Sequence, residues 1–220
     1  MHNQVASAAQ APTISRLPKA IALTAILLVG AAFVLKYVFH YYLNYNPAGF
    51  DVYWPRRGTL LVHITAGMVA LLIGPLQFSK RLRQRHLQLH RVLGRVYLIA
   101  VLCGSLAAMR MAVTTTFGLL WGFSLFCMAL AWITCASMAF YAVKQRQIPV
   151  HQQWMVRTYV VTFAFVTFRV LNDYGPTSQI KPDGERADVV AWACWVLPLL
   201  AAEVIMQLRR MQKQPNALEG

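Results

Sequence analysis

The sequence predicts an all-α membrane protein that crosses the bilayer six times. Hydrophobic residues make up 58% of the 220 residues and charged residues 13%, whereas a soluble domain carries about 25% charged residues. The apolar residues also gather in six stretches, each close to the ~20 residues that a spanning helix needs. This composition excludes a water-soluble enzyme and a disordered chain. The low number of cysteines, four in all, excludes a disulfide framework.

The six stretches follow one another with short loops between them, and the second to the fifth are predicted to form a four-helix core. The chain would then comprise a disordered cytoplasmic tail over residues 1–17, a membrane domain over residues 18–208 and a second cytoplasmic tail over residues 209–220. The expected spans run, in order, from Ala20 to His40, Thr59 to Phe78, His90 to Val113, Phe117 to Val143, Trp154 to Leu171 and Val189 to Leu208.

The basic residues predict how these helices are oriented. Thirteen Lys and Arg residues lie on the side that holds both termini, and four lie in the opposite loops. Because cytoplasmic loops carry the excess of basic residues, both termini are expected in the cytoplasm and the loop from Asn172 to Asp188 outside. The predicted location is the bacterial inner membrane. The same loop pattern accounts for the net charge of +14, so the expected partner is the lipid bilayer and not nucleic acid.

The fifth span carries a polar stripe along one face. At about 100° per residue, His151, Thr158, Thr162 and Arg169 fall close to a common line. Ionisable residues inside a membrane are expensive and usually functional, whereas hydroxyl groups also join neighbouring helices. The stripe therefore indicates either a polar pathway or helix packing, and the sequence leaves both interpretations open.

The second span presents small residues on one face, together with two polar side chains. Small residues allow a neighbouring helix to approach closely, and they would equally accommodate a flat cofactor. Gly94, one turn after His90, gives the third span a weaker version of this face. The face of the second span is formed by His63, Gly67, Ala70, Gly74 and Gln77.

His90 opens the third span and His151 precedes the fifth, so both are predicted near the cytoplasmic surface. In an up-and-down bundle these two helices are diagonal and point the same way, and their imidazoles could face each other across the core. Facing histidines suit the axial positions of a b-type haem. Arg91 and Arg157 lie at the same level, where guanidinium groups would pair with the propionates.

Other histidine arrangements are weaker. His86 and His90 are four residues apart, a spacing that could hold a divalent metal with His151 as the third ligand. His63 enters from the opposite surface, and the fourth span has no histidine to face it. A second haem with two histidine ligands is therefore not expected.

Arg157 and Glu203 are predicted to form a buried ion pair. Each lies about one turn from the cytoplasmic end of its span, so their depths match. A carboxylate without a partner at that depth would be costly or would take up a proton.

At these motifs the sequence resembles a family of predicted bacterial membrane proteins, domain of unknown function 2306. The resemblance covers roughly residues 59–206 and implies a membrane location without assigning a biochemical function. A more distant resemblance to transmembrane cytochromes b and ferric-reductase-like proteins implies haem. The segments that carry these resemblances are His63 with GPLQF from Gly74 to Phe78, HRVLGRVY from His90 to Tyr97, HQQWMVR from His151 to Arg157, and Arg169.

Three classes of function are compatible with these observations. The first is a redox or electron-transfer protein with haem b on His90 and His151, together with a redox partner or quinone. The second is a transporter or binding protein for a small molecule or ion, with His63, Gln77 and the polar stripe along its pathway. Against transport, we expect neither an inverted repeat nor a matched pair of broken helices. The third is a non-catalytic scaffold or assembly factor.

Overall fold

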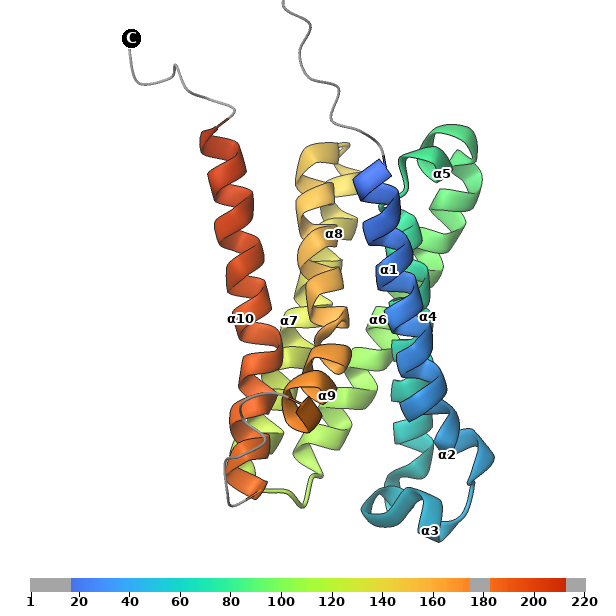
Figure 1. Cartoon of the computed structure of the whole chain (residues 1–220), viewed down its shortest axis with the longest axis vertical. Coiled ribbons are helices and arrows are strands. Elements are labelled where there is room, and N and C mark those ends of the chain that lie inside the picture. The colour runs from blue at the N-terminus through green and yellow to red at the C-terminus, as the bar shows by residue number, and fades with distance from the viewer. Residues whose placement is uncertain (1–16, 175–182, 213–220) are drawn as a thin grey trace, which may run out of the picture.

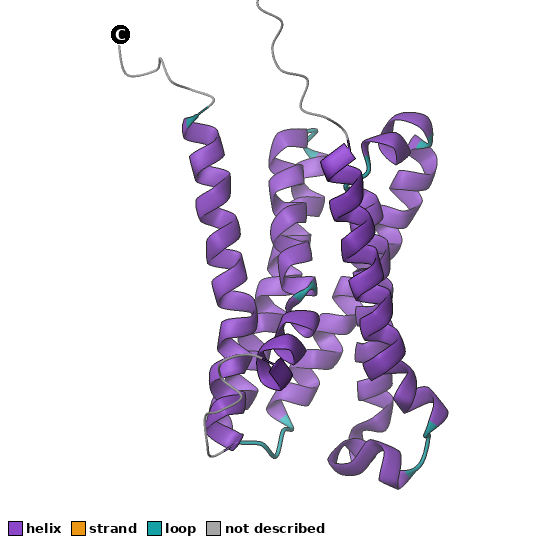
Figure 2. Cartoon of the chain, viewed as in Figure 1, coloured by secondary structure: helices purple, strands orange, loops and turns teal. Residues whose placement is uncertain are grey.

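The computed structural model describes residues 17–174 and 183–212, and within them every regular element is a helix (Figures 1 and 2). Six helical segments are long and apolar enough to cross a membrane, which confirms the predicted fold class. Almost all of the predicted tail over residues 1–17, and most of the tail over residues 209–220, lie outside the described residues. The six segments are Ile21–Leu43, Pro47–Gln77, Leu87–Val113, Leu119–Lys144, Ile148–Tyr174 and Glu185–Met211.

Several of these segments are composed of more than one helix. The first two contain α1 (Leu17–Phe33), the π-helix η1 (Val34–Val38), α2 (Phe39–Leu43), α3 (Pro47–Phe50), the 3-10 helix η2 (Asp51–Arg56) and α4 (Arg57–Gln77). The remaining helices are α5 (Lys80–Arg85), α6 (Leu87–Val113), α7 (Leu119–Lys144), α8 (Ile148–Thr162), α9 (Ala164–Tyr174) and α10 (Asp183–Met211).

The core of the bundle is formed by α4, α6, α7 and α8. Helix α4 packs along α6, α6 along α7 and α7 along α8, and a smaller contact between α4 and α8 closes the ring. Helix α1 lies against α4 from outside, and α10 lies against α7, α8 and α9 (Figure 1). The predicted four-helix core of spans two to five is therefore confirmed.

The first and last described helices meet the same end of the bundle. Figure 1 shows the start of α1, α5 and the end of α10 at the top of the view, and α2 and α3 at the bottom. We call these the terminal end and the distal end. An even number of crossings requires this arrangement. That the terminal end faces the cytoplasm stays a prediction from the basic residues.

Aromatic and small side chains fill the centre of the bundle. Tyr97 and Val101 of α6, Trp132 of α7 and Tyr159 of α8 are buried there. Lipid tails are as apolar as these side chains, so helices in a bilayer associate through close packing and hydrogen bonds. Small residues between the large ones let the backbones approach, and they include Ala70, Ala100, Ala136 and Ala139.

The hydroxyl group of Thr162 joins three helices. It donates to the carbonyl oxygen of Thr158 over 2.9 Å, and it accepts Nε1–H of Trp132 over 2.9 Å. The Tyr97 hydroxyl lies 2.9 Å from the same oxygen. Because a threonine has one hydroxyl proton, and Thr158 accepts it, Tyr97 is the donor in this contact. Two members of the predicted polar stripe thus hydrogen-bond inside the helix packing, and neither side chain has exposed surface.

Candidate functional site

A cavity of about 230 Å³ lies in the distal half of the bundle. Its walls come from the first span, α4, α6, α7 and α9, with one residue each of η2 and α10. Apolar side chains make up most of the lining, and aromatic rings are prominent among them. The side chains with strong hydrogen-bonding groups are Tyr37, Tyr41, Tyr53, His63 and Arg169.

Two spans change their helical geometry where they line this cavity. The first span forms a π-helix over Val34–Val38, which includes the lining residue Tyr37. The fifth span is broken at Phe163, between α8 and α9, and Arg169 follows on α9. Short π-helices are frequent at functional sites. Irregular backbone at membrane depth is tolerated where it is buried in protein or lines a cavity.

The predicted span from Trp154 to Leu171 contains this break, and the sequence gives no sign of it. The segment 154–171 contains no glycine or proline that would signal a break. The hydroxyl of Thr162 donates to the carbonyl of Thr158 in the last turn before the break. Thr158 and Thr65 make the same kind of bond inside continuous helices, so this bond alone does not account for the break.

His63 is held rigidly in the wall of the cavity. Its Nδ1 lies 3.0 Å from the carbonyl oxygen of Gly104 on α6, and its ring packs against Phe165 with centroids 5.1 Å apart. A carbonyl oxygen only accepts, so Nδ1 carries the proton and Nε2 of the neutral ring is an acceptor. His63 therefore connects α4, α6 and α9 at the point where α9 begins.

Arg169 is the cationic group of the cavity. Its guanidinium lies over the ring of Tyr37, 5.1 Å from the centroid. Among the described residues, no oxygen accepts a hydrogen bond from it and no carboxylate forms an ion pair with it. Tyr53 lies within electrostatic reach of Arg169 and Tyr41. The hydroxyl groups of Tyr41 and Tyr53 likewise have no hydrogen-bond partner in the described part of the chain.

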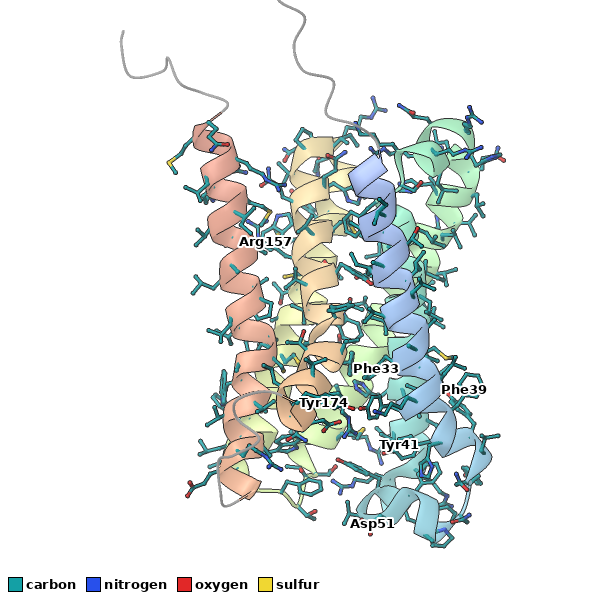
Figure 3. All side chains as sticks on the ribbon, viewed as in Figure 1. Phe33, Phe39, Tyr41, Asp51, Arg157 and Tyr174 are labelled. Carbon is teal, nitrogen blue, oxygen red and sulfur yellow. The ribbon has the colours of Figure 1, made fainter. Side chains whose placement is uncertain are left out.

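Hydrogen bonds at the rim join the first span to the end of α9. Tyr37 donates its hydroxyl to Oδ2 of Asp173 over 2.9 Å, and Nζ of Lys36 donates to the hydroxyl of Tyr174 over 3.0 Å. Figure 3 shows Phe33 and Tyr41 on the first span and Tyr174 on α9, all in the distal half. The rim contacts join η1 of the first span to the end of the fifth span, whereas α1 packs on α4.

The predicted haem ligands lie at the terminal end, away from this cavity. His151 Nδ1 lies 2.8 Å from the carbonyl oxygen of Ala139, which leaves Nε2 for another partner. His90 lies within electrostatic reach of His151 and Arg91. Its buried Nδ1 has no hydrogen-bond partner among the described residues. The structure thus brings the two histidines into one region, and Arg91 is exposed there.

The glycine faces assigned to a flat cofactor are occupied by side chains. A Cβ atom on Gly74 would lie 2.3 Å from the ring of Tyr159, and one on Gly67 would meet the ring of Phe165 at 3.6 Å. Gly94 faces Oε1 of Gln77, at 3.3 Å from an added Cβ. Gly74 therefore serves close packing, whereas a Cβ at Gly67 would make only an ordinary van der Waals contact, and Gly67 lines the distal cavity. Gln77 is buried here at the terminal end, and it does not line the distal cavity.

The three-histidine metal site is not formed. His86 is exposed at the turn between α5 and α6, where its backbone leaves helical geometry, so it does not share the helical face of His90. Within the described residues, no group of three His, Cys, Asp or Glu side chains is placed to hold a metal ion.

The predicted ion pair between Arg157 and Glu203 is confirmed. Arg157 donates from Nε and from one terminal nitrogen to Oε2 of Glu203, over 2.9 and 2.5 Å. Its guanidinium also stacks 4.6 Å from the ring centroid of Trp154. The pair is only partly buried, with 16% of the Arg157 side chain and 37% of the Glu203 side chain exposed. Arg157 is therefore engaged with a carboxylate of the protein itself.

Sequence reasoning missed three residues of the cavity. They are Tyr37 and Tyr41 of the first span and Tyr53 of η2. The signal that could have found them is their depth. They lie in the same half of the bundle as Arg169, and the protein has to accommodate the charge of Arg169 there.

Comparison with known proteins places the chain in a family. It matches no curated protein and no solved structure. Residues 60–206, which include all four core helices almost completely, match the family described as "Predicted membrane protein (DUF2306)". This range agrees with the resemblance over residues 59–206. The chain belongs to this family of predicted membrane proteins of unknown function.

Proposed function

We propose that the protein binds a small, lipid-soluble molecule in the distal cavity. The ligand's polar group would lie beside Arg169 and the tyrosines, and its apolar part between the aromatic rings. The observation that carries this proposal is the coincidence of a cavity with an arginine that has no protein acceptor for its hydrogen bonds. A mainly apolar pocket with a few convergent polar groups is the usual form of a small-molecule site.

The size of the cavity limits the ligand. At about 30 Å³ for each water-sized group, a volume of about 230 Å³ holds about eight such groups. That is enough room for the ligand's polar group and the first part of its chain or ring. The rest of the ligand would extend into the bilayer. Transport of the ligand is a further step for which the two irregular spans, the first and the fifth, provide the elements that could move.

Haem binding at His90 and His151 is a second proposal. The hydrogen bond from His151 Nδ1–H to Ala139 supports it, because histidine ligands of metals usually donate their other ring nitrogen to a carbonyl or carboxylate. The donor set therefore fits a haem iron. The face of Gly74 does not fit its macrocycle, since the ring of Tyr159 fills it, and Gly67 lines the distal cavity, away from these histidines. The redox function consequently has less support than ligand binding in the distal cavity.

Photolabelling tests the binding proposal directly. Alkyl probes that carry a diazirine would be added to the protein in lipid nanodiscs, and the labelled peptides would be identified by mass spectrometry. We expect labels on peptides of α4, α7 and α9 that line the cavity. Ala108→Phe, which places a ring in the cavity, should abolish them. Ala201→Phe, the same change on an exposed position of α10, should not. Labels spread evenly over the lipid-facing surface in all three proteins would contradict the proposal.

A further inference from the structure

We infer that the polar group of the ligand is a carboxylate, and that the cavity takes a single-chain amphipathic monoanion of the fatty-acid type. This inference rests on the proposed binding site and specifies its chemistry. It follows from the charge of the site, from the order of side chains along the cavity and from the narrow shape of the cavity.

The charge of the site calls for an anion. Arg169 is permanently cationic, and its one close contact among the described residues is the face of the Tyr37 ring. Asp173, one turn further along α9, is engaged by the hydroxyl of Tyr37 and by the amide of Asn172. Asp173 lies within electrostatic reach of both Arg169 and Lys36, so one carboxylate faces two cationic groups. Its hydrogen bonds go to other partners, and the guanidinium keeps its donors for a ligand. A carboxylate is the partner that a guanidinium binds through two parallel hydrogen bonds.

Other arginines of the distal end have partners of their own. Arg56 ends η2 and Arg57 begins α4, and each donates to backbone carbonyls and stacks on a neighbouring ring. Arg110 is exposed at the end of α6. These groups are held outside the cavity, so they do not bind the ligand themselves.

Polar and apolar residues are ordered along the cavity. Tyr41, Tyr53 and Arg169 line its distal part, while Met68 and Leu71 of α4 line the part nearest the middle of the membrane. The two tyrosine hydroxyls can donate to a second carboxylate oxygen. Such a gradient suits a molecule with one charged end and one apolar end, with the charged end at the level of the membrane surface.

The cavity is narrow for its length. The lining residues of α4 run from Leu60 to Leu71, which is about 16 Å of helix at ~1.5 Å per residue. A volume of about 230 Å³ distributed over that length has room for one hydrocarbon chain beside the aromatic rings. It has no room for a second chain. This favours a single-chain carboxylate over the head group and paired chains of a phospholipid.

The test compares three diazirine probes with the same alkyl chain and different ends: a carboxylate, an alcohol and an amine. In nanodiscs of neutral lipid, half-maximal labelling of the cavity peptides should need about tenfold less carboxylate than alcohol, as expected for hydrogen bonds to a charged group. Arg169→Gln should remove this preference, and Arg169→Lys should restore part of it. Arg110→Gln, which removes an exposed arginine at the same end, should leave it unchanged.

A second variant guards against misfolding of the arginine mutants. Tyr41→Phe combined with Tyr53→Phe keeps the rings and removes the two hydroxyls, so it should weaken the preference for carboxylate without abolishing labelling. Equal labelling by all three probes, or a preference that survives Arg169→Gln, would overturn the carboxylate inference and leave the binding site standing. Loss of carboxylate labelling when anionic phospholipid is added would assign the site to a phospholipid instead. If no probe labels the cavity, the proposed function itself falls.

Discussion

Replacing Thr162 by valine should destabilise the protein more than any comparable change in the same helix. Valine has nearly the shape of threonine but no hydroxyl, so the packing volume is kept. The change removes the acceptor shared by the indole N–H of Trp132 and the hydroxyl of Tyr97. Thr162 has no exposed surface, and no water is expected to replace the lost oxygen.

The expected magnitude follows from two lost interhelical hydrogen bonds. In membrane proteins such bonds contribute about 0.6 kcal/mol each on average and about 1.7 at most. The loss of both should therefore lower the free energy of unfolding by about 1 to 3 kcal/mol. Tyr97→Phe should cost less, because Thr162 keeps its bonds to Trp132 and to the backbone.

Thr158→Val is the matched control. Thr158 lies one turn away on α8, is equally buried, and its hydroxyl donates only to the carbonyl of Trp154 in its own helix. Its loss leaves no donor unpaired and should change the free energy of unfolding by less than about 0.5 kcal/mol. Unfolding in mixed micelles, followed by tryptophan fluorescence, would measure both. If the two valine variants are equally stable, Thr162 does not join the helices as we argue.

Four further outcomes are expected. Arg157→Gln and Glu203→Gln should each lower the unfolding temperature, and the double variant should be no less stable than either, with a coupling of about 0.5 to 1 kcal/mol. Gly74→Ala should destabilise by about 1 to 3 kcal/mol, because its Cβ would overlap a tyrosine ring. If haem is bound, the reduced absorption band should disappear in His90→Ala and in His151→Ala. A reporter fused to the C-terminus should be active only in the cytoplasm.

Each of these outcomes has a control or a contrary result. Simple additivity of the two glutamine variants would argue against a coupled pair. Gly58→Ala, in the same helix but facing open space, should be neutral or slightly stabilising. A colourless protein that takes up no added haemin would remove the haem proposal. Periplasmic activity of the C-terminal reporter would reverse the predicted orientation.

The sequence predicted the architecture because composition and helical periodicity report directly on it. Six apolar stretches and their loop charges determine the number of crossings, and the depth of Arg157 and Glu203 in their spans was enough to predict their pairing. What could not be predicted depends on helix rotation and on local breaks. From the sequence, the face of Gly74 could contact either a cofactor or a neighbouring helix. Only the three-dimensional structure shows that Tyr159 packs against it.

The break at Phe163 explains why the polar stripe does not act as one surface. In a continuous helix Arg169 would share the face of Thr162, about 10 Å further along the axis. Thr162 is enclosed in the core, where it bonds to Tyr97 and Trp132, whereas Arg169, which follows the break, meets the ring of Tyr37 on the first span. Thr162 thus joins α8 to α6 and α7 just before the break, and the charge on α9 lies in the wall of the cavity.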